Sequence, residues 1–248
     1  MDILINGICG HMGLEVLSQA NDPSSGINVA AGVDPSPAFG MPVPVFKTFG
    51  EVECSVDCIV DFSHHSATAA LTEYAVKKNT PLVIATTGQT EEEKEMIAKA
   101  AKSIPVFFAA NFSIGVALLC ALAKKAAAVM EDAEIEIVEV HHDRKLDAPS
   151  GTALAVAEAI KEARPDSYTV CGRNGHAKRE PGEIGISSVR IGNVVGIHEV
   201  IVGTQNETVT LKHEAHSRAL FASGALTAAK FIAGKTPGLY TMKDMISI

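Results

Sequence analysis

The chain has 248 residues, of which 47% are hydrophobic and 20% are charged. These values are ordinary for a globular protein, and the length suits one large domain or two medium ones. A formal net charge of −8 argues against a general nucleic-acid or anionic-membrane partner, so binding of an anion would need a local basic cluster. The N-terminal residues lack a basic segment followed by a long apolar run, and no apolar stretch approaches about 18 residues. We therefore expect a soluble, cytoplasmic protein.

The cysteines and histidines do not form an evident metal or disulfide pattern. The five cysteines are scattered and include no C-x-x-C pair: Cys9, Cys54, Cys58, Cys120 and Cys171. An odd, scattered set does not fit a disulfide framework, so we expect reduced, buried thiols. His213 and His216 are spaced as two metal ligands could be, but no third ligand has a suitable spacing. We therefore expect no metal site.

The first 110 residues alternate short apolar runs with longer amphipathic ones. The apolar runs predict strands at 2–6, 27–33, 57–61, 82–85 and 105–109, and the amphipathic runs predict helices at 10–20, 66–78 and 90–102. Residues 43–46 are a further candidate strand, although Pro42 and Pro44 count against it. Strand followed by helix, repeated, indicates a parallel sheet with helices on both faces.

From about residue 113 the pattern changes. It predicts helices at 114–130, 151–163 and 219–232, and strands at 133–140, 184–191, 194–202 and 208–213. The dipeptide Gly192-Asn193 stands between two of these strands and favours a β-hairpin. Residues 173–182 are polar and basic, which indicates a mobile loop. We expect the strands to form an antiparallel or mixed sheet in a second domain.

Three glycines, Gly7, Gly10 and Gly13, join the first predicted strand to the first predicted helix. Glycine allows a tight turn and a close approach of the backbone to a pyrophosphate, and a helix N-terminus offers N–H donors and partial positive charge. Cys9 stands where the usual dinucleotide fingerprint has its second glycine. A tight strand-to-helix turn without a ligand is therefore the alternative interpretation.

Three other segments lie where predicted parallel strands end. Asp34 follows the second strand about 20 residues after the last glycine, where an acid can bind a ribose hydroxyl or can simply belong to a turn. The runs 85–88 (Ala-Thr-Thr-Gly) and 109–112 (Ala-Ala-Asn-Phe) end two further strands. Ligands of open α/β sheets bind at these ends, and small residues there would admit a nicotinamide ring.

The segment 141–152, His-His-Asp-Arg-Lys-Leu-Asp-Ala-Pro-Ser-Gly-Thr, is the part of the chain richest in chemical groups. Ser150 is placed to cap a helix, so that the N–H groups of Gly151 and Thr152 would form an anion site. A lysine beside a helix N-terminus suits a carboxylate, and a histidine can donate a proton near neutral pH. A solvated basic turn with an ordinary cap is the alternative.

The run 139–153 carries a specific resemblance. It reads Glu-Val-His-His-Asp-Arg-Lys-Leu-Asp-Ala-Pro-Ser-Gly-Thr-Ala and resembles the signature E-x-H-H-x-x-K-x-D-x-P-S-G-T-A of the dihydrodipicolinate reductase (4-hydroxy-tetrahydrodipicolinate reductase) family, with each fixed position met. The resemblance continues through the glycine turn, 85–88, 109–113, 188–198 and 217–225.

The resemblance implies a fold and a division into domains. Residues 1–112 and 219–248 would form a Rossmann-type dinucleotide-binding domain. Residues 113–218 would form an α+β substrate-binding and oligomerisation domain with a mixed sheet, through which a homotetramer assembles.

The resemblance also implies a reaction and its residues. NADH or NADPH would deliver a hydride to a cyclic imine dicarboxylate, and protonation of the resulting enamine would give tetrahydrodipicolinate for lysine and diaminopimelate biosynthesis. The implied roles are acid/base for His141, proton donor and carboxylate partner for Lys145, and substrate contact for His142, Ser150, Gly151 and Thr152. The implied cofactor-binding residues are Gly7, Ile8, Cys9, Gly10, His11, Met12, Asp34, Ala85, Thr86, Thr87, Ala109, Ala110, Asn111 and Phe112.

The departures from the family pattern all concern the cofactor. Cys9 replaces a glycine, His11 replaces a frequent Arg or Lys, Ala85 replaces a glycine, and no Arg follows Asp34. They leave the choice between NADH and NADPH open.

Two rival functions remain from the sequence. A dinucleotide-binding regulatory protein without catalysis would not need both His141 and Lys145. A two-domain dehydrogenase acting on sugars or semialdehydes would need a lysine or cysteine elsewhere and no carboxylate receptor at 150–152.

Overall fold

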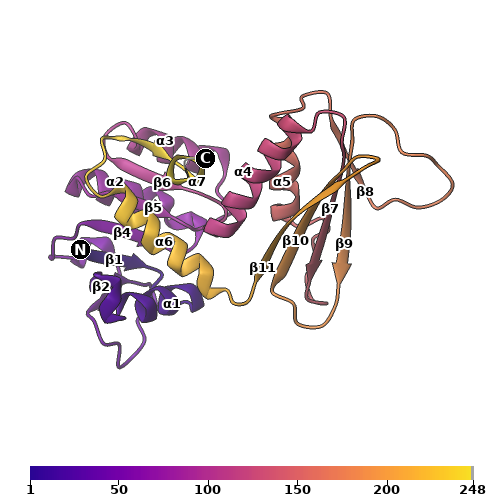
Figure 1. Ribbon diagram of the computed structural model, residues 1–248. Coiled ribbons are helices and arrows are strands. Elements are labelled where there is room, and N and C mark those ends of the chain that lie inside the picture. The colour runs from indigo at the N-terminus through magenta and orange to yellow at the C-terminus, as the bar shows by residue number, and fades with distance from the viewer. Residues whose placement is uncertain (247–248) are drawn as a thin grey trace. The chain divides into compact units, whose positions relative to one another are not determined.

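The structure, a computed structural model, describes residues 1–246 and divides them into two units (Figure 1). The first unit contains residues 1–112 and the C-terminal segment that begins at Ala219, and the second contains Ser113–Arg218. Residues 247 and 248, which we assigned to the dinucleotide-binding domain, lie outside the described residues. Within residues 1–246, no helix has the length and apolar character needed to cross a membrane.

A seven-stranded parallel sheet forms the centre of the first unit, with the strand order β12-β6-β5-β4-β1-β2-β3. Its strands are β1 (Asp2–Asn6), β2 (Asn28–Val33), β3 (Val45–Phe46), β4 (Cys58–Asp61), β5 (Leu82–Ile84), β6 (Pro105–Phe108) and β12 (Gly238–Tyr240). The inner strands are almost wholly apolar because helices cover both faces of a parallel sheet. The strand order reverses between β1 and β4, and ligands of such sheets bind at the carboxyl ends of the strands at this point.

Helices cover both faces of this sheet (Figure 1). They are α1 (His11–Ala20), α2 (Thr68–Lys78), α3 (Glu91–Ala100), α6 (Ala219–Ile232) and the short α7 (Met242–Met245), with single 3-10 turns at Pro23–Ser25, Phe49–Glu51 and His65–Ala67. Helices α1 and α6 pack together, and so do α2 and α3. Helix α6 packs directly against the backbone of Phe112, since a Cβ at Gly224 would be 1.8 Å from the carbonyl oxygen of that residue.

The strands and helices predicted for the first 110 residues are present, with ends shifted by up to two residues. The doubtful strand at 43–46 exists as the two-residue β3. It is an edge strand, where a proline's missing N–H costs no hydrogen bond, and the Pro44 carbonyl accepts from Gly32 N–H. The sequence interpretation missed β12 and α7.

A five-stranded mixed sheet forms the second unit, with the order β11-β10-β7-β9-β8. The strands are β7 (Glu134–His141), β8 (Tyr168–Cys171), β9 (Glu183–Arg190), β10 (Gly196–Gly203) and β11 (Thr208–Ala215). Helices α4 (Ile114–Val129) and α5 (Gly151–Lys161) pack on each other and cover one face (Figure 1). Their buried core with the sheet includes Ala123, Ile135, Ile137, Val156, Ile160, Ile184, Ile186, Val200 and Val202.

The predicted hairpin around Gly192-Asn193 is wrong. β9 and β10 are not neighbours, because β7 lies between them, parallel to β9 and antiparallel to β10. The connecting turn crosses the end of β7, where Ile191 N–H donates to the His141 carbonyl (2.8 Å) and His142 N–H donates to the Val194 carbonyl (2.8 Å). Pairing of β7 with both β9 and β10 at the centre of the sheet, with Ile135 and Ile137 buried, overrides the local turn signal. The prediction also missed β8.

All five cysteines are free thiols. The expectation that they are buried is correct only for Cys58. Cys171 is exposed at the end of the edge strand β8, and Cys9, Cys54 and Cys120 are partly buried.

We predict that Gly224→Ala destabilises the first unit. The added methyl group has no space against the Phe112 carbonyl, so helix α6 must shift, at a cost of about 1–3 kcal/mol. Chemical denaturation measures this loss. The matched control is Ser223→Ala, on the exposed side of α6, and equal stability of the two variants would contradict the close packing.

Candidate functional site

The glycine turn of the first unit is shaped so that only glycine fits at its key positions. Gly7 has a φ of +78°, and its N–H donates to the Val33 carbonyl (2.8 Å) at the end of β2. A Cβ at Gly7 would lie 2.6 Å from the Phe62 carbonyl oxygen, and a Cβ at Gly13 would lie 2.1 Å from the Gly7 carbonyl oxygen. The first turn of α1 can therefore lie against the end of β1.

The N-terminus of α1 suits an anionic ligand. Gly10 is the N-cap and provides no side-chain cap, and the first N–H groups of any helix, here those of His11 and Met12, have no acceptor within the helix. The turn thus fits a pyrophosphate, as the sequence predicts. The Ile8 side chain is fully buried, so only its backbone is available to a ligand.

Asp34 ties the glycine turn to the end of β2. It is 9% exposed, and its carboxylate accepts hydrogen bonds from the N–H groups of Cys9 (3.1 Å) and Ser36 (2.9 Å). The Cys9 sulfur accepts a hydrogen bond from Ala38 N–H (3.4 Å). Cys9 therefore has a local structural role at the position where the fingerprint has glycine, and Asp34 keeps further lone pairs for a ligand.

The other predicted cofactor residues follow β5 and β6. Ala85 is partly buried, Thr86 is buried and Thr87 is exposed, and the run from Ala109 to Asn111 is partly or fully exposed. Phe112 differs, because its ring is buried beside Phe62 and Phe107. Its side chain belongs to the core.

Sequence reasoning did not single out Asn6 or Asp61, which belong to a polar cluster at the carboxyl end of β4. The buried Asp61 carboxylate accepts from Asn6 Nδ2 (2.7 Å) and from Ser63 Oγ (2.6 Å). Burial raises the pKa of Asp61 despite these hydrogen bonds. The cluster lies where the strand order reverses, and only the fold reveals that β1 and β4 are neighbours.

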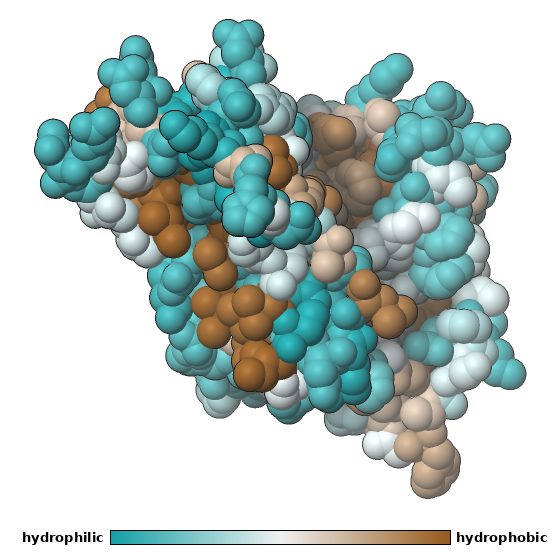
Figure 2. Space-filling view, turned by 90° about the vertical axis from the view of Figure 1, so that its right-hand side faces the viewer, coloured by the Kyte–Doolittle hydropathy of each residue, from teal (hydrophilic) through white to brown (hydrophobic). Residues whose placement is uncertain are grey.

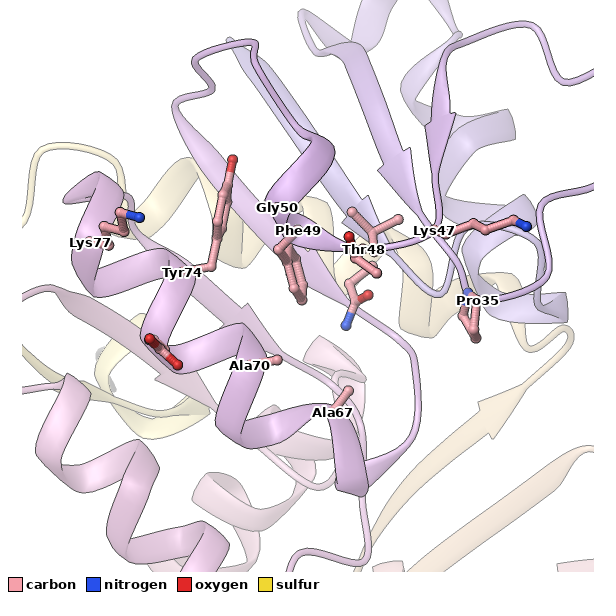
Figure 3. Close-up of a pocket in the computed structure, with 12 residues that line it drawn as sticks. Pro35, Lys47, Thr48, Phe49, Gly50, Ala67, Ala70, Tyr74 and Lys77 are labelled. Atoms are coloured by element: carbon pink, nitrogen blue, oxygen red, sulfur yellow. The ribbon is translucent and has the colours of Figure 1, made fainter.

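A cavity of about 440 Å³ adjoins the ends of β1 and β2 (Figure 3). Its lining includes Asn6, Val33, Pro35, Thr48, Phe49, Ala67, Ala70 and Tyr74. The rings of Phe49 and Tyr74 stack with centroids 5.0 Å apart. A cavity of this size with mostly apolar walls can hold a flat ring system.

On the helix-covered face of the second unit's sheet, the buried side chains change from apolar to polar along the strands. On β7, the buried row of Ile135 and Ile137 continues into Glu139 and His141, because alternate residues share a face. The register places His198 of β10 opposite Glu139, and Arg190 of β9 beside His141. One end of this face is therefore core, and the other end is a buried polar network.

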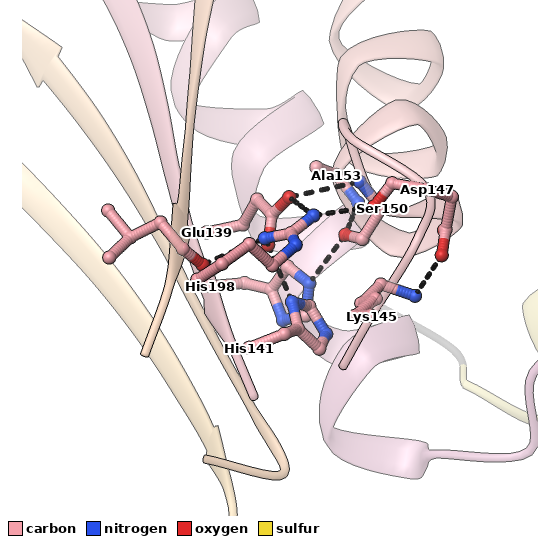
Figure 4. A network of polar contacts seen from close by, with 9 residues as sticks. Glu139, His141, Lys145, Asp147, Ser150, Ala153 and His198 are labelled. Carbon is pink, nitrogen blue, oxygen red and sulfur yellow. Dashed lines mark hydrogen bonds and ion pairs between the residues drawn. The ribbon is translucent and has the colours of Figure 1, made fainter. Parts of the chain in front are cut away.

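Glu139 is the centre of this network (Figure 4). It has no exposed surface. Arg190 donates two hydrogen bonds to its two carboxylate oxygens (2.8 Å each), His141 Nδ1 lies 2.5 Å from Oε2, and Ser150 N–H donates to Oε1 (3.1 Å). Burial opposes ionisation of Glu139, but the hydrogen bonds from Arg190, His141, Ser188 and Ser150 outweigh it and lower its pKa to about 2. Glu139 is therefore a carboxylate.

Ser150 caps α5 as predicted. Its hydroxyl accepts from Ala153 N–H (3.2 Å) and lies 3.1 Å from His198 Nε2, and the residue is 1% exposed. The hydroxyl thus caps the third residue of the helix rather than the first two. A Cβ at Gly151 would meet nothing within 4 Å, so the first turn of α5 borders open space.

Lys145 and Arg190 both contact Asp147, in the loop that precedes this helix N-terminus. Lys145 Nζ pairs with Asp147 (2.8 Å), and Arg190 also donates to the Asp147 carbonyl (2.6 Å). Burial lowers the pKa of His142, and the charges of Arg144 and Arg218 lower it further. Sequence reasoning did not single out Arg218, although it lies within the segment 217–225 that carries the resemblance.

His198 and His213 also belong to this end of the sheet. Burial, and then the neighbouring His141, lower the pKa of His198 to about 4, so it is neutral at neutral pH. His213 lies opposite His198 in the register, with Nε2 3.4 Å from Ser113 Oγ. Among residues 1–246, no three His, Cys, Asp or Glu residues are grouped so that they could hold a metal ion.

The first unit has a doubly wound sheet with a glycine turn, which is typical of dinucleotide binding. The second unit has a histidine–carboxylate pair beside a helix N-terminus and several cations. Together these features define the class of dinucleotide-dependent reductases. The chain belongs to the dihydrodipicolinate reductase family. The family profile described as "Dihydrodipicolinate reductase, N-terminus" matches residues 1–112, and the one described as "Dihydrodipicolinate reductase, C-terminus" matches residues 115–246.

Curated relatives and solved structures agree with this assignment. The chain is 46% identical to the 4-hydroxy-tetrahydrodipicolinate reductase of Caldanaerobacter subterraneus subsp. tengcongensis and 41% identical to that of Clostridium novyi, each over 98% of this chain and 97% of the relative. A dipicolinate-bound dihydrodipicolinate reductase from Paenisporosarcina sp. TG-14 superposes with a TM-score of 0.84 at 27% identity, covering 100% of this chain and 99% of that one. A probable dehydrogenase from Thermotoga maritima, at 11% identity and a TM-score of 0.65 over 98% of this chain and 92% of that one, shares the fold. The predictions of family, fold class and enzyme class are confirmed.

We predict that His198 makes the second unit sensitive to acid. The unfolded chain binds a proton at this histidine near pH 6.5, whereas the folded chain binds it only near pH 4. Between these values the unfolded state holds more protons, so stability is complete above pH 6.5 and falls by about 3 kcal/mol as the pH drops to 4. Denaturation curves across this window should show the loss, and His198→Gln should reduce it.

His176→Gln is the control for this experiment, because His176 is exposed. It should retain the acid dependence of the unsubstituted chain. The same acid dependence in His198→Gln would contradict the account.

Proposed function

We propose that this chain reduces 4-hydroxy-tetrahydrodipicolinate (dihydrodipicolinate) to tetrahydrodipicolinate with NADH or NADPH. The observation that carries the proposal is the network around Glu139, which holds a histidine and the start of helix α5 together beside several cations. A cyclic dicarboxylate needs such a cationic site, and the similar structure from Paenisporosarcina contains dipicolinate. The net charge of −8 makes this local cluster necessary.

The first unit would hold the cofactor. The glycine turn, from Gly7 to Met12, and the uncapped start of α1 suit the pyrophosphate. Asp34 would accept from a ribose hydroxyl, which favours NADH, and the cavity beside Pro35 suits the adenine. The segments 85–87 and 109–112 would flank the nicotinamide. When bound, the cofactor supplies the hydride.

The second unit would hold the substrate. One carboxylate would accept from the N–H groups of Gly151 and Thr152 at the start of α5, which borders open space. Lys145 and His142 would bind the dianion, and a substrate carboxylate would compete with Asp147 for Lys145. The cations of this unit thus select a doubly anionic ring.

His141 would supply the proton that completes the reduction. Its Nδ1 faces the Glu139 carboxylate and so carries the hydrogen of that hydrogen bond. The other ring nitrogen, Nε2, has no hydrogen-bond partner within the described part of the chain, and the side chain is 10% exposed. Nε2 is therefore the atom that would exchange a proton with the substrate.

The second unit would also assemble a homotetramer. The sheet face opposite α4 and α5 carries Val138, Val140, Ile197 and Ile201, all partly buried, and the exposed Val189. Figure 2 views the side of the molecule that β8 and β9 occupy in Figure 1 and shows hydrophobic patches (brown) among hydrophilic residues (teal). Pairing of such faces between copies would cover these apolar side chains.

We predict that the chain oxidises NADH or NADPH when it is supplied with the product of dihydrodipicolinate synthase. The loss of absorbance of the reduced nicotinamide measures the reaction. Omission of the substrate is the control, and it should give no oxidation. The absence of substrate-dependent oxidation with both cofactors would contradict the proposed function.

We predict that His141→Gln lowers kcat roughly 10²–10⁴-fold, which is the usual contribution of a general acid. Glutamine cannot deliver a proton at neutral pH, while the glycine turn that binds the nucleotide is unchanged. Steady-state kinetics and fluorescence titration with NADH measure the two effects separately. His176→Gln is the matched control, and an unaltered kcat in His141→Gln would remove His141 from the mechanism.

A further inference from the structure

Glu139 connects two parts of the proposed site, the ring of His141 and the cap residue Ser150, which lies eleven residues after Glu139 in the sequence. Its Oε2 atom holds the ring of His141, and its Oε1 atom holds the N–H of Ser150, the cap of helix α5. The residue has no exposed surface, so it does not itself present an atom to solvent. Any influence on the reaction must pass through the groups that it holds.

Arg190 makes an ionised carboxylate possible at this buried position. An isolated carboxylate in an apolar interior would take up a proton, but Arg190 forms two parallel hydrogen bonds with Glu139 (2.8 Å each). Such bidentate pairs are stronger and more directional than single ones. Arg190 is itself fixed, since it also donates to the carbonyls of Val189 (2.8 Å) and Asp147 (2.6 Å).

The ring of His141 is confined on its other side by β10. A Cβ at Gly196 would lie 3.1 Å from His141 Nε2, so a larger residue would crowd the ring. The His198 ring meets the His141 ring edge to face, with centroids 5.1 Å apart. Because burial lowers the pKa of His198 to about 4, this neighbour carries no positive charge at neutral pH.

We propose that Glu139 and Arg190 are a positioning pair for the reaction. The ionised carboxylate keeps the hydrogen of neutral His141 on Nδ1, which leaves Nε2 as the proton-exchanging atom, and it holds the start of α5 at a constant distance from that atom. The effect on turnover rests on the proposed function, whereas the effect on the tautomer of His141 does not.

Glu139→Gln tests the pair, because it keeps the shape of the side chain and removes one acceptor. If the amide oxygen stays on Ser150 N–H, the amide nitrogen faces His141 Nδ1 and forces the ring hydrogen to Nε2. We expect ¹⁵N NMR of labelled histidine, with His141 assigned from the His141→Gln spectrum, to show this reversed tautomer. We expect kcat to fall roughly 10²–10⁴-fold, as when a histidine loses its orienting carboxylate.

The pH profile is a second readout that a purely structural role would not move. An imidazolium without its anionic partner is less stable, so the alkaline limb of kcat against pH should shift to lower pH in Glu139→Gln. Binding of dipicolinate, measured by calorimetry, should change much less than kcat. Glu158→Gln is the matched control, since it removes an exposed carboxylate of α5, and it should leave all three measurements unchanged.

Arg190→Met provides an independent route to the same result. The unpaired Glu139 would take up a proton and donate it to His141 Nδ1, which again moves the ring hydrogen to Nε2. An unchanged tautomer together with an unchanged pH profile in either folded variant would overturn the proposal. Failure of both variants to fold would also overturn it, because the pair would then be structural only.

The outcome separates this proposal from the function. The tautomer can be measured in the absence of substrate. A reversed tautomer in a chain that lacks reductase activity would retain the pairing and reject the proposed reaction. Normal activity with the original tautomer in Glu139→Gln would retain the proposed reaction and reject the pairing.

Discussion

Two parallel hydrogen bonds from Arg190 keep the carboxylate of Glu139 ionised at a position without exposed surface. A buried charge of this kind is tolerated only when its partners satisfy it almost completely. That requirement brings together residues from β7, β9, the loop after β7 and the cap of α5. The arrangement of histidine and helix N-terminus that supports reductase chemistry follows from satisfying this one group.

The same constraint links the site to the core of the second unit. Ile135, Ile137, Glu139 and His141 occupy one face of β7 because side chains alternate along a strand. A slip of one residue in the pairing of β7 would bury its other face and remove both polar residues from the site. The apolar residues packed under α4 and α5 therefore also set the position of His141.

Local patterns predicted much of this architecture. The glycine turn, the Ser150 cap and the alternation of strands and helices each depend on residues close in sequence. The hairpin prediction failed because β9 pairs with β7 rather than with the strand that follows it. Local patterns also could not predict the partners in the network around Glu139, because these partners are distant in sequence. Arg190 is 51 residues from Glu139, and His198 is 48 residues from Ser150. Only the register of the folded sheet brings them together.

A crystal structure with dipicolinate and reduced cofactor would test the central claim most directly. The account predicts that one ligand carboxylate accepts hydrogen bonds from the start of α5, that His141 Nε2 faces the ligand ring, and that Arg190 keeps both hydrogen bonds to Glu139. Dipicolinate bound away from the start of α5, or a His141 ring turned away from Glu139, would contradict the account.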